Sequence, residues 1–304
     1  MKQYRVLLAA YQLPALYRVK AQLRTLDRWH SCTPDLLPRD VAEPVAGIEH
    51  ESMLYTCRMH FTADFVADLS WQQYLRAICW PQAVDFFCIE QNLWEQHKYL
   101  AVFDMDATLI KNEVIDELAA EHQVGHKVAG ITERAMRGER DFNTSIRARV
   151  DLLKGLSVAS FAHVQQRIKP QNGLYTLFDR LQQSQIKTAI FSGGFTVFAQ
   201  SLADQLQVDH LHANQLETDA KGYLTGRLSG KIVNAAYKAV LLQQLIQQYN
   251  IKPAQTIAVG DGANDIPMLQ TAGIGIAFHA KLKVKEQVLH AIDHTDLRSI
   301  GALL

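Results

Sequence analysis

Residues 99–108, which read YLAVFDMDAT, decide the fold: a five-residue apolar run is followed at once by two aspartates. Such a run is typical of a buried parallel strand. Asp104 and Asp106 are alternate residues of an extended segment, so both would face one site. Two carboxylates this close repel each other unless a cation binds or one is protonated, and oxygen ligands favour Mg²⁺ over zinc. An EF-hand loop is excluded, because its Gly and Glu positions hold Leu109 and Ile115.

Similar apolar runs recur downstream and alternate with amphipathic helices. The predicted strands are Tyr99–Phe103, Lys187–Phe191, Thr256–Val259 and Ile274–Phe278, and the predicted helices include Gly173–Gln183, Thr196–Gln207 and Tyr237–Tyr249. This alternation predicts an α/β fold with a doubly wound, mostly parallel, Rossmann-like sheet. Residues 113–170 carry helical segments without a strand pattern, which indicates a helical cap inserted into that fold. A turn at Asp219–Gly222 predicts a small hairpin.

Two further polar clusters follow predicted strands. Ser192-Gly193-Gly194 comes before a helix, where backbone amides can bind an anion, although a plain strand-to-helix turn explains the triplet equally well. The segment 260–265 departs from the dinucleotide fingerprint, because Asp265 replaces its third glycine. Its acidic side chains fit metal ligands or their supports better. Since ligands bind beyond the carboxyl ends of parallel strands, we expect these clusters, Asp104 and Lys238 to meet and perform phosphoryl transfer to an aspartate.

Residues 1–95 differ in pattern from the rest of the chain. Predicted strands at Tyr4–Ala10, Met53–Phe61 and Ala83–Ile89 alternate with predicted helices at Pro14–Trp29 and Trp71–Trp80. This order predicts a small α+β domain, for which a ferredoxin-like or ACT-like module is one interpretation. That module needs one more strand, which is either missing or lies within residues 32–51. The remaining residues, 96–304, would form the catalytic domain with its cap at about 113–170.

The composition limits the classes of partner. The 304 residues contain 31 Lys+Arg and 31 Asp+Glu, and this balance argues against nucleic-acid or membrane binding. All four cysteines lie in the first third without a C-x-x-C pair, which indicates reduced thiols and a cytoplasmic location. No apolar stretch reaches the roughly 18 residues of a membrane span. We expect a small-molecule substrate and consider a homodimer formed through the N-terminal domain.

The polar clusters resemble the four motifs of the haloacid dehalogenase-like phosphatases. The matching segments are Phe103–Thr108, Phe191–Phe195, Lys238 and Gly260–Asp265. Segments of the predicted cap are similar to those of the members that hydrolyse O-phosphoserine; they are Glu113 with 115–117, 132–139, 141–142 and 146–150. The resemblance extends from Tyr99 to Ser299. It departs from the family at Ala107, where Ser or Gly is usual, and this position would contribute backbone only.

The resemblance implies a Mg²⁺-dependent phosphatase that converts O-phosphoserine to serine and phosphate, in serine biosynthesis, through an aspartyl-phosphate. Asp104 would be the nucleophile and Asp106 the general acid and base. The metal ion would be held by Asp104, the backbone carbonyl of Asp106 and Asp261, and Thr108 and Asp265 would support the site. The phosphoryl oxygens would be held by Ser192, Gly193, Lys238 and Asn264. The alternative within enzymes is a related phosphatase or phosphotransferase for another small phosphomonoester, and outside enzymes an anion-sensing protein.

The resemblance also implies that the cap selects the substrate. Glu113 would pair with its ammonium group and Arg149 with its carboxylate, which a guanidinium can bind through both oxygens. Phe142 and Met136 would close an apolar lid over it. Without the resemblance, these four residues would be interpreted as surface charges and ordinary cap packing.

Overall fold

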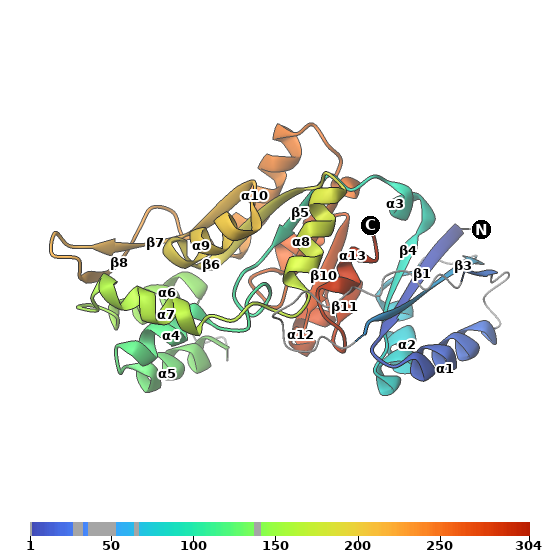
Figure 1. Cartoon of the computed structure of the whole chain (residues 1–304), viewed down its shortest axis with the longest axis horizontal. Helices are drawn as coiled ribbons and strands as arrows, with labels where there is room; N and C mark the ends of the chain where they lie inside the picture. Colours follow the sequence, from blue (N-terminus) through green and yellow to red (C-terminus); the bar gives the residue numbers. More distant parts are fainter. Residues whose placement is uncertain (1, 27–32, 36–52, 64–66, 137–140) are drawn as a thin grey trace.

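The computed structural model describes residues 2–26, 33–35, 53–63, 67–136 and 141–304, which form one mixed sheet with helices on both faces (Figure 1). Within these residues the sheet has 11 strands. In spatial order they are β2 (Thr33–Asp35), β3 (Tyr55–Ala63), β1 (Lys2–Ala10), β4 (Asp85–Glu90), β11 (His290–Ile292), β10 (Ile274–Phe278), β9 (Thr256–Gly260), β5 (Leu100–Phe103), β6 (Lys187–Phe195), β7 (His210–Thr218) and β8 (Leu224–Ser229). The strands from β11 to β7 are parallel, which confirms the predicted α/β fold.

Alternate residues of the central strands bury opposite faces of the sheet. Ala101 and Phe103 of β5 pack with α8 (Leu174–Gln183), α9 (Thr196–Leu206) and α13 (Arg298–Gly301). Leu100 and Val102 pack on the other face, against α10 (Ala235–Gln248), α11 (Ile266–Thr271) and α12 (Leu282–Lys285). Because both faces of β5 are covered, its four residues are all apolar. The strand therefore holds the loop after it, residues 104–108, in a fixed place.

Two predicted boundaries are wrong in ways that have a physical cause. The helix predicted to reach Trp29 is α1 (Leu13–Arg24), and the hydroxyl of Thr25 at its end donates to the carbonyl of Gln22. Trp29 lies outside the described residues. The strand predicted to end at Phe191 continues to Phe195, with a shift of its register against β7. Ser192-Gly193-Gly194 therefore belongs to an irregular strand rather than to a helix N-terminus.

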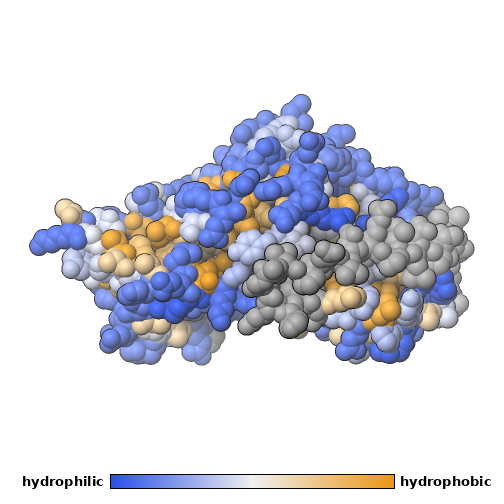
Figure 2. Space-filling view, in the orientation of Figure 1, coloured by the Kyte–Doolittle hydropathy of each residue, from blue (hydrophilic) through white to orange (hydrophobic). Residues whose placement is uncertain are grey.

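The inserted cap lies at one end of the molecule (Figure 1). Its helices are α4 (Val114–Glu121), α5 (Gly125–Met136), α6 (Phe142–Asp151) and α7 (Phe161–Arg167). Its two connections to the core pair with each other through a bridge between Ile110 and Pro170. Beside them lies a cavity of about 270 Å³, whose lining combines apolar residues such as Ile168, Phe198 and Leu202 with three glutamines. Figure 2 shows apolar residues gathered on this face, where the cap meets α9.

The N-terminal residues occupy the opposite end of the molecule and extend the core sheet (Figure 1). Their elements follow the order β1, α1, β2, β3, α2 (Leu69–Cys79), β4, and α3 (Gln91–Glu95) leads into the core. The strand β2 lies within residues 32–51 and pairs with β3. Phe86 of β4 pairs with Ala291 of β11, so the two sheets are continuous. Within the described residues, the short 3-10 helices are Trp80–Gln82, Val158–Ser160 and Pro253–Gln255.

No helix in the described part of the chain has the length and apolar character that crossing a membrane requires.

A buried aspartate fastens the N-terminal strands to the core, and its loss should destabilise the protein strongly. The carboxylate of Asp85 accepts hydrogen bonds from the amides of residues 293–295 at 2.8–3.0 Å and from the hydroxyl of Thr295 at 2.7 Å. We expect Asp85→Ala to lower the free energy of unfolding by about 3 kcal/mol, because several buried donors lose their acceptor. Urea denaturation measures this change.

The matched control is Asp68→Ala, which removes an exposed aspartate that caps α2 through the amide of Trp71. That variant should lose about 1 kcal/mol. An equal loss in both variants would mean that Asp85 does not hold the segment 293–295.

Candidate active site

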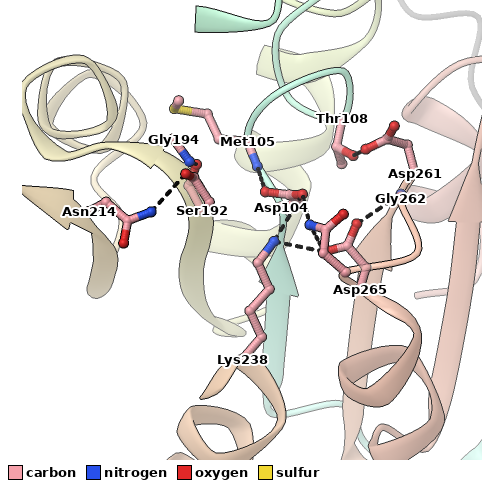
Figure 3. Close-up of polar contacts among 12 residues, drawn as sticks. Asp104, Met105, Thr108, Ser192, Gly194, Asn214, Lys238, Asp261, Gly262 and Asp265 are labelled. Carbon is pink, nitrogen blue, oxygen red and sulfur yellow. Dashed lines mark hydrogen bonds and ion pairs between the residues drawn. The ribbon is translucent and has the colours of Figure 1, made fainter. Parts of the chain in front are cut away.

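Three ion-paired side chains lie at the carboxyl end of the central strands (Figure 3). The Nζ atom of Lys238 is 2.9 Å from Oδ2 of Asp104 and 2.7 Å from Oδ1 of Asp265. Asp104 follows β5, Lys238 lies in the first turns of α10, and Asp265 precedes α11. Burial lowers the pKa of Lys238, but the two carboxylates outweigh it and hold the pKa above its usual value. A fixed positive charge therefore sits beside the predicted nucleophile.

The same edge of the sheet carries a set of carboxylates that could hold a divalent metal ion. One oxygen from each of Asp104, Asp261 and Asp265 lies within 4.8 Å of the others. Burial, together with the charges of Asp104 and Glu113, raises the pKa of Asp261 to about 7. Such crowding of negative charge is relieved by a cation, and an all-oxygen set fits Mg²⁺. The set includes Asp265, which we expected only as a support.

Asp106 is half-buried, and one of its carboxyl oxygens is buried and unpaired. Its Oδ1 atom has no hydrogen-bond partner among the described residues. Burial, with the charges of Glu113 and Asp104, raises the pKa of Asp106 well above its usual value. A carboxyl group of this kind can carry a proton and give it to a leaving group. Ala107, the departure from the family motif, has a φ of 54°, a conformation in which glycine is favoured.

The Ser192-Gly193-Gly194 segment is fixed by side-chain hydrogen bonds. Ser192 is fully buried, and its hydroxyl accepts a hydrogen bond from the amide of Gly194 at 2.8 Å. The amide of Asn214 donates to the carbonyl of Gly193 at 2.7 Å, and its oxygen accepts from the amide of Val233 at 2.9 Å. Sequence reasoning missed Asn214, because a single asparagine within a strand carries no recognisable signal. It ties the segment to the residues that lead into α10 and Lys238.

The loop after β9 turns its polar side chains inward. The amide of Asn264 donates to Oδ2 of Asp104 at 3.3 Å and to Oδ1 of Asp265 at 3.2 Å. The other oxygen of Asp265 accepts from the amide of Gly262 at 3.0 Å. Asp265 makes no side-chain capping bond to α11, and its carboxylate instead forms the ion pair with Lys238. The hydroxyl of Thr108 donates to Oδ1 of Asp261 at 3.4 Å, which links this loop to the one after β5.

Two charged residues of the cap are available to a ligand. Glu113 precedes α4, is exposed, and makes no side-chain capping bond. The surrounding protein still desolvates its carboxyl group, and with the charges of Asp104 and Asp116 this raises the pKa of Glu113 to about 7, while Arg149 acts to lower it. The Nε atom of Arg149 is buried and has no hydrogen-bond partner among the described residues. The cap therefore brings one negative and one positive group beside the site, where their charges act on each other and on Asp104 and Asp106.

The predicted apolar lid is described in part. A Cβ atom on Gly193 would lie 3.0 Å from Cζ of Phe142, so the start of α6 contacts the core beside Ser192. This close approach explains why residue 193 is glycine. Met136 is the last residue of α5, and its side chain lies outside the described residues. Of the cap segment 132–139, residues 137–139 also lie outside them.

Comparison with known proteins identifies the family that this chain matches. The model of the haloacid dehalogenase-like hydrolase family matches residues 100–273. Over the whole chain, the fold is similar to that of a HAD family hydrolase from Salmonella enterica serovar Typhi, with a TM-score of 0.83 and 30% identity over 100% of this chain and 98% of that one.

Two curated relatives share more of the sequence. The phosphoserine phosphatase of Haemophilus influenzae is 45% identical over 205 residues, which are 67% of this chain and 65% of that protein. The phosphoserine phosphatase of Streptococcus thermophilus is 44% identical over 207 residues, which are 68% of this chain and 96% of that protein. The match to the first therefore spans slightly less than two-thirds of that protein's length, whereas the match to the second spans nearly all of its length.

Proposed function

Because the chain belongs to the haloacid dehalogenase-like hydrolases, we propose that it is a phosphoserine phosphatase that hydrolyses O-phosphoserine to serine and phosphate. The observation that carries this proposal is that a site suited to phosphoryl transfer lies next to charged groups suited to binding an amino acid. A carboxylate cluster with Lys238 surrounds Asp104, and cap groups of opposite charge, Glu113 and Arg149, lie near it. The two curated relatives, both named phosphoserine phosphatases, support the same substrate.

In the proposed reaction, the Asp104 carboxylate attacks phosphorus, and an aspartyl-phosphate forms as the bond to the serine oxygen breaks. Asp106 gives its proton to that oxygen, and its raised pKa suits this role. Asp106 then takes a proton from water as the water attacks the aspartyl-phosphate. This second step releases phosphate and restores Asp104. Lys238 stabilises charge on the transferring oxygens, with Ser192, Gly193 and Asn264 as hydrogen-bond donors.

The donor set fits Mg²⁺, so we include this ion in the proposal. Asp104, Asp261 and the backbone carbonyl of Asp106 would hold it, and the pairing of Asp265 with Lys238 leaves Asp265 as a support. When bound, the ion would neutralise negative charge on the phosphoryl group. Thr108 would orient Asp261 through their hydrogen bond.

Recognition of the serine part falls to the cap. Glu113 pairs with the ammonium group of the substrate, and Arg149 binds its carboxylate. Phe142, which already contacts the core at Gly193, closes the site against water together with Met136. Because Glu113 would bind an ammonium group and Arg149 a carboxylate, the pocket would select an amino acid that carries a phosphate.

Removal of the guanidinium should damage recognition of phosphoserine and spare simpler esters. We expect Arg149→Ala to lower kcat/KM for phosphoserine roughly 100-fold, because two charge-assisted hydrogen bonds are lost. The value for p-nitrophenyl phosphate, which has no carboxylate, should change less than about threefold. Arg147→Ala, an exposed arginine on the same helix, is the control and should change neither. Equal losses on both esters would exclude Arg149 from substrate selection.

The proposed function itself is tested by phosphate release from a panel of phosphoserine, phosphoethanolamine, 3-phosphoglycerate and p-nitrophenyl phosphate. We expect phosphoserine to be preferred and activity to require added magnesium after treatment with a chelator. Preference for another ester of the panel would show that phosphoserine is not the substrate. Transfer of phosphate to an added alcohol instead of water would identify a phosphotransferase.

The same proposal covers the rest of the chain. Residues 1–95 form a small ACT-like α+β domain and residues 96–304 the phosphatase domain; the strand order β2-β3-β1-β4 supports the former, because it suits a ferredoxin-like sandwich. Residues Cys57, Cys79 and Cys88 are free thiols, which supports a cytoplasmic location, where serine biosynthesis would use the product. A homodimer would form through the N-terminal domain, and light scattering tests it.

A further inference from the structure

A hydrogen bond joins the start of the cap helix α6 to the start of α10, the helix that carries Lys238. The Nδ2 atom of Asn234 donates to Oδ1 of Asn143 at 3.0 Å. Asn143 is the second residue of α6, and Asn234 directly precedes α10. The bond therefore connects the cap to the core next to the residues that would hold the phosphate. The proposed reaction does not use it.

The side chain of Asn234 has a task at each of its two ends. Its Oδ1 atom accepts a hydrogen bond from the amide of Tyr237 at 3.0 Å and so caps α10. This bond fixes the orientation of the side chain and leaves its NH₂ group to donate toward the cap. Of the other residues that cap helices well, aspartate has no donor, and serine or threonine has one oxygen atom for both tasks. Asparagine is therefore suited to cap α10 and hold α6 at the same time.

The helix α6 is held near both of its ends. At its start, the bond from Asn234 acts beside the apolar contact between Phe142 and Gly193. At its other end, α6 lies against β8 (Figure 1), where a Cβ atom on Gly226 would be 3.2 Å from Cα of Asp151. An apolar contact allows sliding, whereas a hydrogen bond has a preferred distance and direction. The bond to Asn143 therefore fixes where α6 lies along the core.

The position of α6 determines the position of Arg149. This residue follows Asn143 by six positions, about 9 Å along the helix axis. Burial lowers the pKa of Arg149, and the charges of Glu113, Asp116 and Asp106 act in the opposite direction, so its guanidinium lies within their reach. A shift of α6 would move this guanidinium relative to the phosphate-binding residues. Small displacements of a positioned group have large effects on how well it engages a substrate.

We propose that Asn143 and Asn234 are positioning residues whose hydrogen bond, the α6 tether, holds Arg149 at the distance from the phosphate site that phosphoserine requires. The inference rests on the proposed function, because it assigns the substrate carboxylate to Arg149. Both asparagines are half-buried, so water can replace the bond when it breaks. The tether would therefore set the affinity for phosphoserine and contribute little to the stability of the fold.

The experiment removes each end of the α6 tether separately. Asn143→Ala removes the acceptor, and Asn234→Ser keeps a cap for α10 but is too short to donate to the cap. We expect each variant to raise KM for phosphoserine about fivefold, with kcat within about twofold, because one hydrogen bond is lost. KM for p-nitrophenyl phosphate, which has no carboxylate for Arg149, should stay within about twofold. The control, Arg147→Ala, removes an exposed side chain of the same helix and should change neither value.

The double variant Asn143→Ala/Asn234→Ser tests whether the two residues act through one bond. We expect its KM for phosphoserine to equal that of either single variant, since the second substitution has nothing left to remove. Hydrogen exchange of the substrate-free proteins gives a readout that needs no activity. The amides of α6 should exchange about fivefold faster in all three variants, and those of α10 should exchange as in wild type.

Three outcomes would overturn the inference alone. They are an unchanged KM for phosphoserine in the single variants, equal increases for both esters, and a double variant whose KM rises by the product of the two single effects. Unchanged exchange of the α6 amides would also overturn it, because the helix would then be held without the tether. Failure of the wild-type protein to hydrolyse phosphoserine would overturn the proposed function, whereas faster exchange in the variants would still show that the bond holds α6.

Discussion

Replacement of Asp104 by asparagine is expected to abolish turnover of phosphoserine, with a fall in kcat of at least about 10⁴-fold. The asparagine side chain has nearly the same shape and keeps an oxygen for the amide of Met105, which Oδ1 of Asp104 accepts at 2.7 Å. An amide group, however, is a poor nucleophile toward phosphorus and cannot form an aspartyl-phosphate. Acid quenching and mass spectrometry should detect a phosphorylated protein in wild type and none in the variant.

The control for this prediction is Asp106→Asn, which keeps the nucleophile and removes the acid. With p-nitrophenyl phosphate, whose leaving group needs no proton, this variant should still form the covalent intermediate and should accumulate it, because the base for its hydrolysis is missing. A covalent phosphate on Asp104→Asn protein would move the nucleophile to another residue.

Replacement of Lys238 by methionine should lower both activity and stability. We expect kcat/KM to fall about 10³-fold, since a preorganised positive charge beside the transferring oxygens is lost. The free energy of unfolding should fall by about 3–5 kcal/mol, because Lys238 is fully buried and Asp104 and Asp265 would lose their shared partner. Steady-state kinetics and urea denaturation measure the two effects.

The double variant Lys238→Met/Asp265→Asn separates these effects. Removal of one uncompensated carboxylate should recover much of the stability, while activity stays low because the positive charge is still absent. Recovery of activity in the double variant would show that Lys238 acts only by neutralising Asp265. Loss of stability without loss of activity in the single variant would remove it from phosphoryl transfer.

The central sheet and most of the site could be predicted because their signals are local. The run Leu100–Phe103 is apolar throughout since both faces of β5 are buried, and this composition is visible without a structure. The topological rule that ligands bind beyond the carboxyl ends of parallel strands then placed Asp104 and Asp261 together. Lys238 lies on a helix rather than after a strand, so this rule does not place it, and the sequence offered it only as the positive charge that phosphoryl transfer needs.

The features of the fold that the sequence could not predict depend on contacts between residues far apart along the chain. Gly193 and Gly194 have low strand propensity, yet β6 continues through them because it pairs at Phe195 with Asn214, whose amide also holds Gly193. The pairing of β4 with β11 joins residues about 200 positions apart, and the hydrogen bonds of Asp85 that support it connect to backbone amides, which carry no sequence signal. The strand β2 contains Pro34, which argues against a strand in any local pattern.

The join between β4 and β11 has a consequence for protein engineering. Removal of residues 1–95 to obtain a minimal catalyst would leave β11 as a bare edge and would uncover core residues that now pack against Leu7, Phe87 and Ile89. An exposed apolar edge strand is a template for aggregation. The phosphoserine phosphatase of Streptococcus thermophilus is matched over 96% of its length by 207 residues of this chain, so an enzyme without a counterpart to the other residues exists in nature. In the present chain, a truncation of that kind would need charged or proline substitutions along β11 to keep the product monodisperse.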